Sequence, residues 1–242
     1  MFNSQVHKIL KSHLIPADKF IYGFANLSGL LHQKFDGYSY GISVLRQLND
    51  KIVDGIKDGP TLEYLNHYTE INHQLLFISE HIADDLIKAG IKAIPIKPTV
   101  TSDSKEFDQY LPTLRYDVSH KMVATRAGLG WIGKTDLFIS LIFGARVRLA
   151  SVLIDKEISP ESEPINKSRC GSCSLCVVKC PAHAATGQLW DIDTDRDVFF
   201  DAFKCREKCS EFGKNLLKID KRICGICIAV CPVGMEKKSQ IK

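Results

Sequence analysis

The cysteines constrain this chain most, because all nine of them lie between positions 170 and 231 of a 242-residue sequence. Four of them have the spacing C-x2-C-x2-C-x3-C-P, which runs from Cys170 to Pro181. A second group repeats the last three cysteines of this pattern and also ends in a proline, Pro232. This spacing is typical of ligands to [4Fe–4S] clusters, since the short loops wrap one cube and the proline turn carries the chain away from it. The sequence therefore predicts two cubane clusters.

One ligand must come from outside these two groups. Two cubanes need eight thiolates in total, whereas Lys221 stands where the second group lacks its first cysteine. Cys205 and Cys209 lie between the groups, and either completes the set; we favour Cys205. In two-cluster proteins the fourth cysteine of each group binds the other cluster. The predicted ligands are therefore Cys170, Cys173, Cys176 and Cys231 for one cluster, and Cys180, Cys205, Cys224 and Cys227 for the other.

Two other uses of cysteine fit this pattern less well. A zinc site takes four ligands in two pairs, which gives no reason for a third cysteine at the same spacing before x3-C-P. A disulfide framework is typical of exported proteins, and residues 1–20 lack the continuous apolar segment of an export signal. The longest apolar run, 137–143, is too short to span a bilayer. We therefore expect a cytoplasmic protein with no membrane partner.

The net charge gives no argument for a nucleic-acid partner once the clusters are counted. The formal net charge of +4 suggests such a partner at first, but each cubane with its four thiolates adds about two negative charges. The loaded protein is then close to neutral, and we expect no nucleic-acid partner. Hydrophobic residues make up 45% of the chain, enough for a large domain with a small one appended. The polar stretch at 159–164 separates the two, and we predict domains at 1–158 and 165–242.

Apolar spacing predicts three helices in the cysteine-free part of the chain. They lie at 1–20, 61–89 and 119–127, each with an apolar stripe at helical spacing or a stop at a following glycine. The second has Thr61 as its predicted N-cap and Gly90 directly after its end.

The remaining apolar runs predict strands. The run at 91–96 contains Pro95, which favours an edge position because proline cannot donate to a neighbouring strand. The runs at 137–143 and 147–154 are separated by Gly144 and Ala145, and they predict an antiparallel hairpin. Helices packed on a mixed sheet, an α+β fold, fit this order of elements.

Three glycines and a lysine lie between the last predicted helix and the predicted hairpin. The segment reads Arg126-Ala127-Gly128-Leu129-Gly130-Trp131-Ile132-Gly133-Lys134, which is neither a P-loop nor a Rossmann fingerprint. A structural turn explains it, and so does a close approach of the backbone to a cofactor. Together with the two cysteine groups, the segment resembles epoxyqueuosine reductases and their relatives, the reductive dehalogenases.

This resemblance extends over about residues 115–235. It implies an α+β domain of nitroreductase-like shape that binds cobalamin, followed by a ferredoxin-like double-cubane domain that delivers electrons to the cobalt. It supports Cys205 as a cluster ligand, and it implies a low-potential electron donor such as ferredoxin or flavodoxin. The cofactor contacts it implies are Arg126, Gly128, Gly130, Trp131, Ile132, Gly133 and Lys134.

The sequence departs from the family in three places. The chain ends soon after Cys231, without the C-terminal helical repeats with which typical epoxyqueuosine reductases hold tRNA. The family has an Asp-Tyr-His element whose aspartate is thought to donate a proton, and no aspartate stands at the matching 67–69. The gap from Cys180 to Cys205 is also longer than usual in the family. A tRNA substrate is therefore the lesser expectation.

His67 and Tyr68 are the candidate proton donors, since the pKa of histidine lies nearest neutrality. The competing interpretation of His67 is a core residue, because it lies on an apolar stripe. We expect an iron–sulfur oxidoreductase that passes electrons to cobalamin for reduction of an unidentified substrate. The alternative is an electron-transfer protein that has no corrinoid of its own and reduces a partner, such as a corrinoid protein. The lesser alternative is epoxyqueuosine reductase activity on tRNA.

Overall fold

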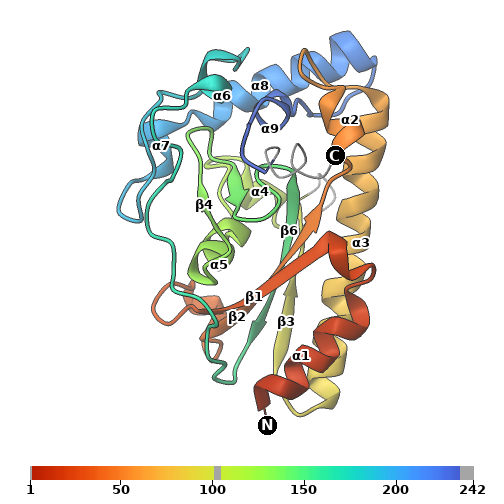
Figure 1. The fold of residues 1–242 in the computed structure, drawn as a ribbon, viewed down its shortest axis with the longest axis vertical. Coiled ribbons are helices and arrows are strands. Elements are labelled where there is room, and N and C mark those ends of the chain that lie inside the picture. The colour runs from red at the N-terminus through yellow and green to blue at the C-terminus, as the bar shows by residue number, and fades with distance from the viewer. Residues whose placement is uncertain (1, 101–104, 235–242) are drawn as a thin grey trace, which may run out of the picture. The chain divides into compact units, whose positions relative to one another are not determined.

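The structure is a computed structural model that describes residues 2–100 and 105–234 (Figure 1). Two compact units alternate along the chain. The first unit consists of Met1–Gln47, Ile71–Leu129 and Arg148–Ile165, and the second of Leu48–Glu70, Gly130–Val147 and Asn166–Lys242. The last change of unit falls directly after the polar stretch at 159–164. Residues 48–70 and 130–147 group with the cysteines, which a single linear boundary does not anticipate.

The first unit is built on a four-stranded sheet with the strand order β1-β2-β6-β3. β1 pairs antiparallel with β2, so that Phe20 lies opposite Arg46, and β3 pairs antiparallel with β6. The predicted strand at 91–96 is confirmed as β3, and its place at the edge suits Pro95. The strands are β1 (Phe20–Asn26), β2 (Tyr40–Gln47), β3 (Ala93–Ile96) and β6 (Val147–Ile154).

Helices α1 (Phe2–His13) and α5 (His120–Arg126) begin and end near the predicted positions, with one exception. The prediction of a helix as far as residue 20 is wrong, because the chain turns after His13 and a 3₁₀ turn, η1 (Ala17–Lys19), leads into β1. α5 contacts β1 and β2, and the Ser119 hydroxyl caps it by accepting from the Met122 amide at 3.3 Å. The other short elements of this unit are η2 (Gln33–Phe35) and α4 (Phe107–Tyr110).

The long predicted helix is confirmed as α3 (Leu62–Lys88). Its N-terminus is capped as predicted, since the Tyr64 amide donates to the Thr61 hydroxyl at 3.1 Å. Its C-terminus is followed by Gly90 at φ +79°, a left-handed conformation that favours glycine. The apolar stripe is buried at Tyr64, Ile71, Leu75, Ile78 and Ile82.

The predicted hairpin of 137–143 with 147–154 is wrong. β5 (Phe138–Ser140) instead pairs antiparallel with β4 (Gly130–Ile132), and β6 lies between β2 and β3 in the other sheet. β6 has five consecutive buried residues at its end, as expected for an internal strand covered on both faces. An apolar run does not specify its pairing partner, and here the glycine segment supplies the partner of β5.

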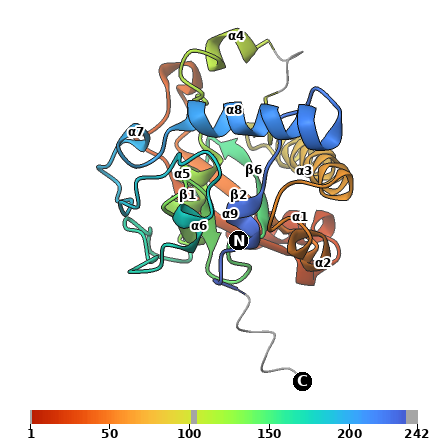
Figure 2. The ribbon, with the colours of Figure 1, turned by 90° about the horizontal axis from the view of Figure 1, so that it is seen from above.

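The second unit carries the cysteines on short helices and loops. The helices are α2 (Asp50–Asp54), α6 (Leu175–Val178), α7 (Arg196–Phe199), α8 (Ala202–Phe212), the π-helical η3 (Gly213–Leu217) and α9 (Ile226–Ala229). α8 continues directly into η3 (Figure 2). α6 and α9, which each follow the start of a cysteine group, contact each other. The whole is a mixed α/β fold with a small cysteine-bearing part.

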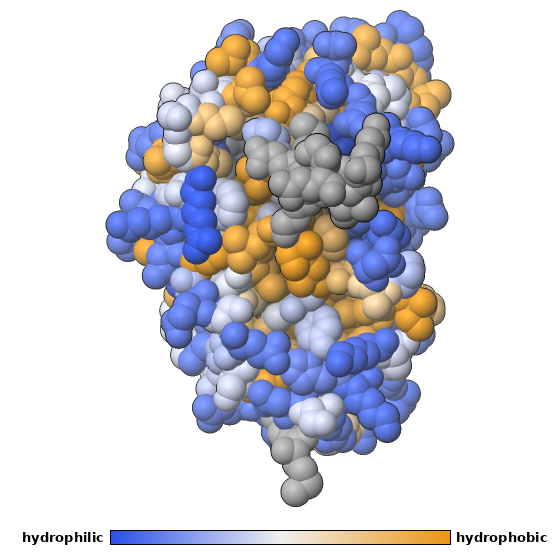
Figure 3. Space-filling view, viewed as in Figure 1, coloured by the Kyte–Doolittle hydropathy of each residue, from blue (hydrophilic) through white to orange (hydrophobic). Residues whose placement is uncertain are grey.

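Within residues 2–100 and 105–234, no helix is long and apolar enough to cross a bilayer. Figure 3 shows one face of the molecule, on which hydrophilic residues cover much of the area and hydrophobic residues gather near the centre.

Candidate iron–sulfur site

Both cysteine groups have the same local structure. The first group (Cys170, Cys173, Cys176 and Cys180) and the second group (Cys224, Cys227 and Cys231) each begin in a loop and continue into a single helical turn, α6 or α9. A glycine in the left-handed region follows the first cysteine of each, Gly171 at φ +53° and Gly225 at φ +96°. A side chain at Gly225 would also lie 2.5 Å from Ile56. The glycines therefore let each loop turn tightly around a common point.

Cys231 of the second group lies among cysteines of the first group. Burial raises the pKa of its thiol to about 11, and the nearby sulfurs of Cys170, Cys176 and Cys173 raise the pKa as well. These three are the cysteines with which the crossed ligand pattern groups Cys231. A cluster would take all four as thiolates, so that the iron, rather than solvent, would compensate the buried charge.

Cys227 of the second group lies near Cys205 and near cysteines of both groups. Burial raises the pKa of its thiol well above the ordinary range, and Cys224 and Cys205 add to this electrostatically. Cys176 and Cys180 of the first group contribute in the same direction. Four of these five residues form the predicted second ligand set, which stays a prediction, as does the first.

The two candidates for the eighth ligand lie one turn apart on α8. Cys209 hydrogen-bonds with both Cys205 and Cys224, and these bonds raise the pKa of Cys209 while lowering the pKa of Cys205. The same contact lowers the pKa of Cys224 to about 7. Cys209 therefore lies within reach of both Cys205 and Cys224. The choice of Cys205 over Cys209 as the eighth ligand stays a prediction.

All nine cysteines lie in the described part of the chain, and none forms a disulfide. Within the same residues, no three His, Cys, Asp or Glu side chains converge on a position for a single metal ion. A cubane differs from a mononuclear site in this respect, because each of its four irons takes one thiolate and the sulfurs stand around the cube.

The side chains of the glycine segment contact the first cysteine group. The Trp131 indole N–H donates to the Sγ of Cys170 at 3.4 Å. The Nζ of Lys134 donates to the carbonyl oxygens of Gly171 at 3.0 Å and Cys173 at 2.9 Å. Trp131 and Lys134 are 5% and 7% exposed. The β4–β5 hairpin thus holds the loop that begins the first group.

The glycines of the segment are required by close packing. A side chain at Gly130 would lie 2.1 Å from the carbonyl oxygen of Ile139 on the paired strand β5. At Gly133 it would lie 3.2 Å from the Ile139 side chain, which is a tight contact, and at Gly128, where φ is +70°, 2.6 Å from Ser162. These contacts explain the glycines without a bound cofactor.

The other two members of the predicted cofactor set are also engaged within the protein. The Arg126 guanidinium donates to the carbonyl of Ile165 at 3.2 Å, and Ile132 is buried in β4. A cofactor role for the seven residues of the set stays a prediction.

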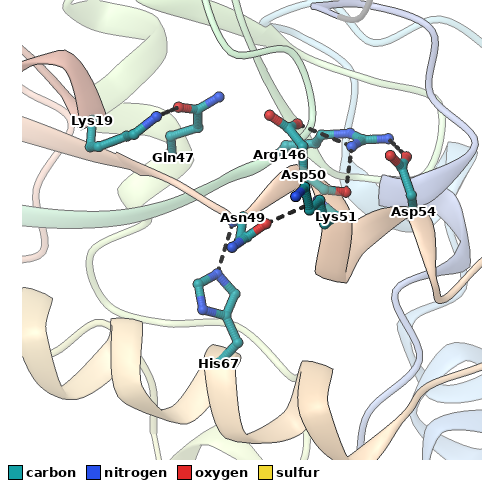
Figure 4. A network of polar contacts seen from close by, with 8 residues as sticks. All are labelled: Lys19, Gln47, Asn49, Asp50, Lys51, Asp54, His67 and Arg146. Atoms are coloured by element: carbon teal, nitrogen blue, oxygen red, sulfur yellow. Dashed lines mark hydrogen bonds and ion pairs between the residues drawn. The ribbon is translucent and has the colours of Figure 1, made fainter.

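His67 accepts a hydrogen bond rather than offering a proton at the same atom. Its Nε2 accepts from the backbone amide of Asn49 at 2.9 Å, and the Asn49 side chain in turn caps α2 by accepting from Lys51 (Figure 4). Tyr68 lies beside Tyr64, with 6.4 Å between ring centroids. An Nε2 that accepts from an amide carries no proton, so catalysis by His67 would have to use Nδ1. The catalytic role of both residues stays a prediction.

Arg146 is a residue that the sequence reasoning missed. Its side chain is 4% exposed, and its two terminal nitrogens contact Asp50 at 3.0 Å and Asp54 at 2.6 Å on α2 (Figure 4). α2 contacts α9, the helix that carries Cys227. The signal in the sequence was the pair of aspartates four residues apart, which lie on one face of a helix.

His120 lies in the first unit and is held by two hydrogen bonds. Its Nδ1 is 2.9 Å from the hydroxyl of Ser151 and its Nε2 is 2.9 Å from the carbonyl of Lys97. Since a carbonyl can only accept, the proton is on Nε2 and Nδ1 accepts from Ser151. Burial lowers the pKa of His120 to about 4, and the nearby Arg148 lowers it further, against the hydrogen bond to Lys97. His120 is therefore neutral near pH 7.

The comparisons with known proteins agree with this geometry. Residues 169–234 match the family model of the 4Fe-4S double cluster binding domain. This part of the chain is a double [4Fe–4S] cluster domain. The match includes every cysteine singled out from the sequence, and the cofactor prediction of two clusters is thereby confirmed.

The family resemblance predicted from the sequence is also confirmed. The chain is similar to an epoxyqueuosine reductase of Cyclobacterium marinum, with 32% identity over 117 residues that cover 48% of this chain and 36% of that protein. The chain thus spans about a third of the length of the curated relatives it matches.

Solved structures share the fold. An epoxyqueuosine reductase of Streptococcus thermophilus matches with a TM-score of 0.57 and 19% identity, covering 96% of this chain and 66% of that one. A reductive dehalogenase described as acting by B12-dependent dehalogenation matches with a TM-score of 0.64 and 15% identity, over 88% of this chain and 29% of that one. At these identities the likeness concerns the fold alone, and a nitroreductase-like topology stays a prediction.

Proposed function

We propose that this chain is a cytoplasmic iron–sulfur oxidoreductase that passes single electrons from a low-potential donor, through two [4Fe–4S] clusters, to a corrinoid. The observation that carries the proposal is the convergence of the two cysteine groups, with Cys231 among Cys170, Cys173 and Cys176. Crossed ligation of this kind holds two cubes close together. Electrons that enter one cluster then reach the other without a mobile carrier.

The ligands we propose are the eight predicted cysteines. Cys170, Cys173, Cys176 and Cys231 would hold the first cluster, and Cys180, Cys205, Cys224 and Cys227 the second. Cys209 would keep its proton and donate to sulfur, which is a contact that tunes cluster potentials. Ferredoxin and flavodoxin are the donor classes that supply electrons at a suitably low potential.

The corrinoid part of the proposal rests on the resemblance to epoxyqueuosine reductases and reductive dehalogenases. The side chains of Trp131 and Lys134 are committed to the first cysteine group, so they do not by themselves form a corrinoid pocket. A corrinoid would supply a metal that accepts single electrons and reacts with the substrate, whereas the protein would supply orientation and a suitable potential. Residues 1–158 are the proposed corrinoid-binding domain.

Two alternatives each rest on a specific observation. The side chains of Trp131 and Lys134 contact the first cysteine group. This favours a protein that has no corrinoid of its own and reduces a partner, such as a corrinoid protein. The names of the curated relatives favour epoxyqueuosine reductase activity on tRNA. Against the latter stands the absence of an aspartate at 67–69.

The deciding experiment is anaerobic purification followed by analysis of iron, sulfide and cobalt. Optical spectra are recorded before and after addition of cobalamin and a low-potential reductant. About eight irons with one reducible bound cobalamin support the proposal. About eight irons without corrinoid binding support the electron-donor alternative, and fewer irons contradict the double-cluster site itself. Binding of tRNA that weakens steeply as salt rises would favour the third function.

A further inference from the structure

Lys134 is a buried cation whose contacts are all neutral. Its side chain is 7% exposed. Among the described residues, its Nζ forms no ion pair with a carboxylate, and its hydrogen bonds go to the carbonyl oxygens of Gly171 and Cys173. Carbonyl oxygens satisfy the donors of an ammonium group but do not neutralise its charge. Burial of an uncompensated charge is costly, so such a group normally has an opposite charge nearby.

The first cysteine group supplies the position where that opposite charge would lie. Both carbonyls that Lys134 contacts belong to the loop from Cys170 to Cys173. The preceding residue, Gly133, approaches the Sγ of Cys170, since an added Cβ there would lie 3.6 Å from this sulfur. A [4Fe–4S] cube with its four thiolates carries about two negative charges. A cube held at this position and the ammonium would compensate each other.

We propose that the Lys134 ammonium is the counter-charge of the first cluster and raises the reduction potential of that cluster. The inference rests on the proposed double-cluster site. Reduction adds one electron and therefore one negative charge to the cube. A fixed cation close to the cube stabilises the reduced state more than the oxidised state, and the effect is strong where protein replaces water. Lys134 thus holds the loop through its hydrogen bonds and raises the reduction potential of the cluster through its charge.

The chain offers a matched control for this charge. Lys179 lies within the same cysteine group, but its side chain is exposed. Water and salt screen an exposed charge, so its removal has little effect on a nearby potential. Lys134→Met removes the buried charge, Lys134→Arg retains it, and Lys179→Met removes an exposed charge from the same cysteine group, at the end of α6.

The test is an anaerobic redox titration of each loaded protein, followed by electron paramagnetic resonance, with iron counted in every sample. In Lys134→Met one cluster is expected to shift to a lower potential while the other is unchanged. Lys134→Arg and Lys179→Met are expected to match the wild type. A Lys134→Met protein with about eight irons and both potentials unchanged would overturn the proposal.

Loss of iron from Lys134→Met is also informative. If this variant retains only about four irons and Lys134→Arg recovers about eight, the position requires a positive charge, which supports the proposal. If Lys134→Arg loses the same irons, the loop requires the shape of lysine, and the proposal fails. The iron content of the wild type tests the double-cluster site separately, because it is measured before any variant is compared.

Discussion

At the scale of single residues, the nine cysteines differ in what their neighbours impose on them. Cys205 and Cys209 stand one helical turn apart on α8, and their contacts raise the pKa of Cys209 and lower the pKa of Cys205. A cluster iron binds thiolate, not thiol. These directions favour Cys205 as the ligand, which stays a prediction.

Replacement of these two cysteines by serine distinguishes their roles. We expect Cys205→Ser to lose one cluster, about four of about eight irons, because a ligand is removed. Cys209→Ser is the matched control on the same helix and is expected to keep both clusters, with at most a shifted potential. Iron and sulfide analysis with electron paramagnetic resonance measures both. Loss of a cluster from the Cys209 variant alone would show that the ligand is Cys209.

His120 makes the stability of the folded protein depend on pH, and its pKa fixes the direction of that dependence. Its pKa is about 4 in the folded protein and about 6.5 in an unfolded chain. Between these values the unfolded state binds more protons, so the contribution of His120 to stability is lost as pH falls from about 6.5 to about 4. His120→Gln lacks this titration, and its loss of hydrogen bonds is expected to cost about 1–2 kcal/mol at pH 7.

The measurement is the midpoint of thermal unfolding for the wild type and for His120→Gln across this pH range. The gap between the two midpoints is expected to narrow as pH falls. A constant gap would mean that folding does not shift the pKa of His120, and a gap that widens in acid would mean that the folded protein binds the proton more tightly than the unfolded chain.

At the scale of elements, α2 depends on a buried ion-pair network. Arg146 is almost fully buried and contacts both aspartates of the helix, whose own side chains are 27% and 51% exposed. Removal of the guanidinium leaves the aspartates in contact with water, so Arg146→Met is expected to lower the free energy of unfolding by about 1–2 kcal/mol through lost hydrogen bonds. Lys51→Met removes an exposed charge from the same helix and is expected to change it by less than about 0.5 kcal/mol. Equilibrium denaturation of the loaded proteins gives the free energy of unfolding of each variant. If Arg146→Met and Lys51→Met change it equally, the contacts of Arg146 with the two aspartates do not stabilise the protein.

The β4–β5 hairpin gives a second test at this scale. An alanine at Gly130 would place its Cβ 2.1 Å from the Ile139 carbonyl, which the pairing of the strands cannot accommodate. We expect Gly130→Ala to separate the strands, to release Trp131 and Lys134 from the first cysteine group, and to reduce the iron content. Gly55→Ala is the control, because Gly55 has a helical conformation and its nearest contact would be 3.4 Å. Full iron content in both variants would exclude a role of the hairpin in cluster loading.

The elements also show which features the sequence predicts and which it does not. Thr61 and Gly90 mark the ends of α3 because capping and left-handed glycine are local properties. Pro95 indicates an edge strand for the same reason. The partner of β5 is not a local property, and the run at 147–154 joined a different sheet. For the site, cysteine spacing predicts the clusters, whereas the contacts of Trp131 and Lys134 depend on pairing between β4 and β5.

At the scale of the whole molecule, the two units differ in how they are stabilised. The first unit has a four-stranded sheet covered by helices and a core of fully buried residues such as Leu10, Phe24 and Val123. The second unit presents its first cysteine group on a largely exposed loop, with α6 and α9 only four residues long. Helices this short are unstable without tertiary support, and bound metal supplies folding free energy to small metal-binding domains.

Removal of the clusters is therefore expected to affect the two units unequally. After the clusters are destroyed by oxidation and the iron is chelated, we expect amide hydrogen exchange to accelerate by several orders of magnitude in residues 166–234, because local opening there is no longer opposed by iron–sulfur bonds. Strands β1, β2, β3 and β6 are expected to retain their protection, since their hydrogen bonds and core do not involve cysteine. Hydrogen exchange with mass spectrometry reports both regions in one sample. Equal loss of protection in the two regions would show that the sheet depends on the clusters, and unchanged protection in both would show that the cysteine loops fold without them.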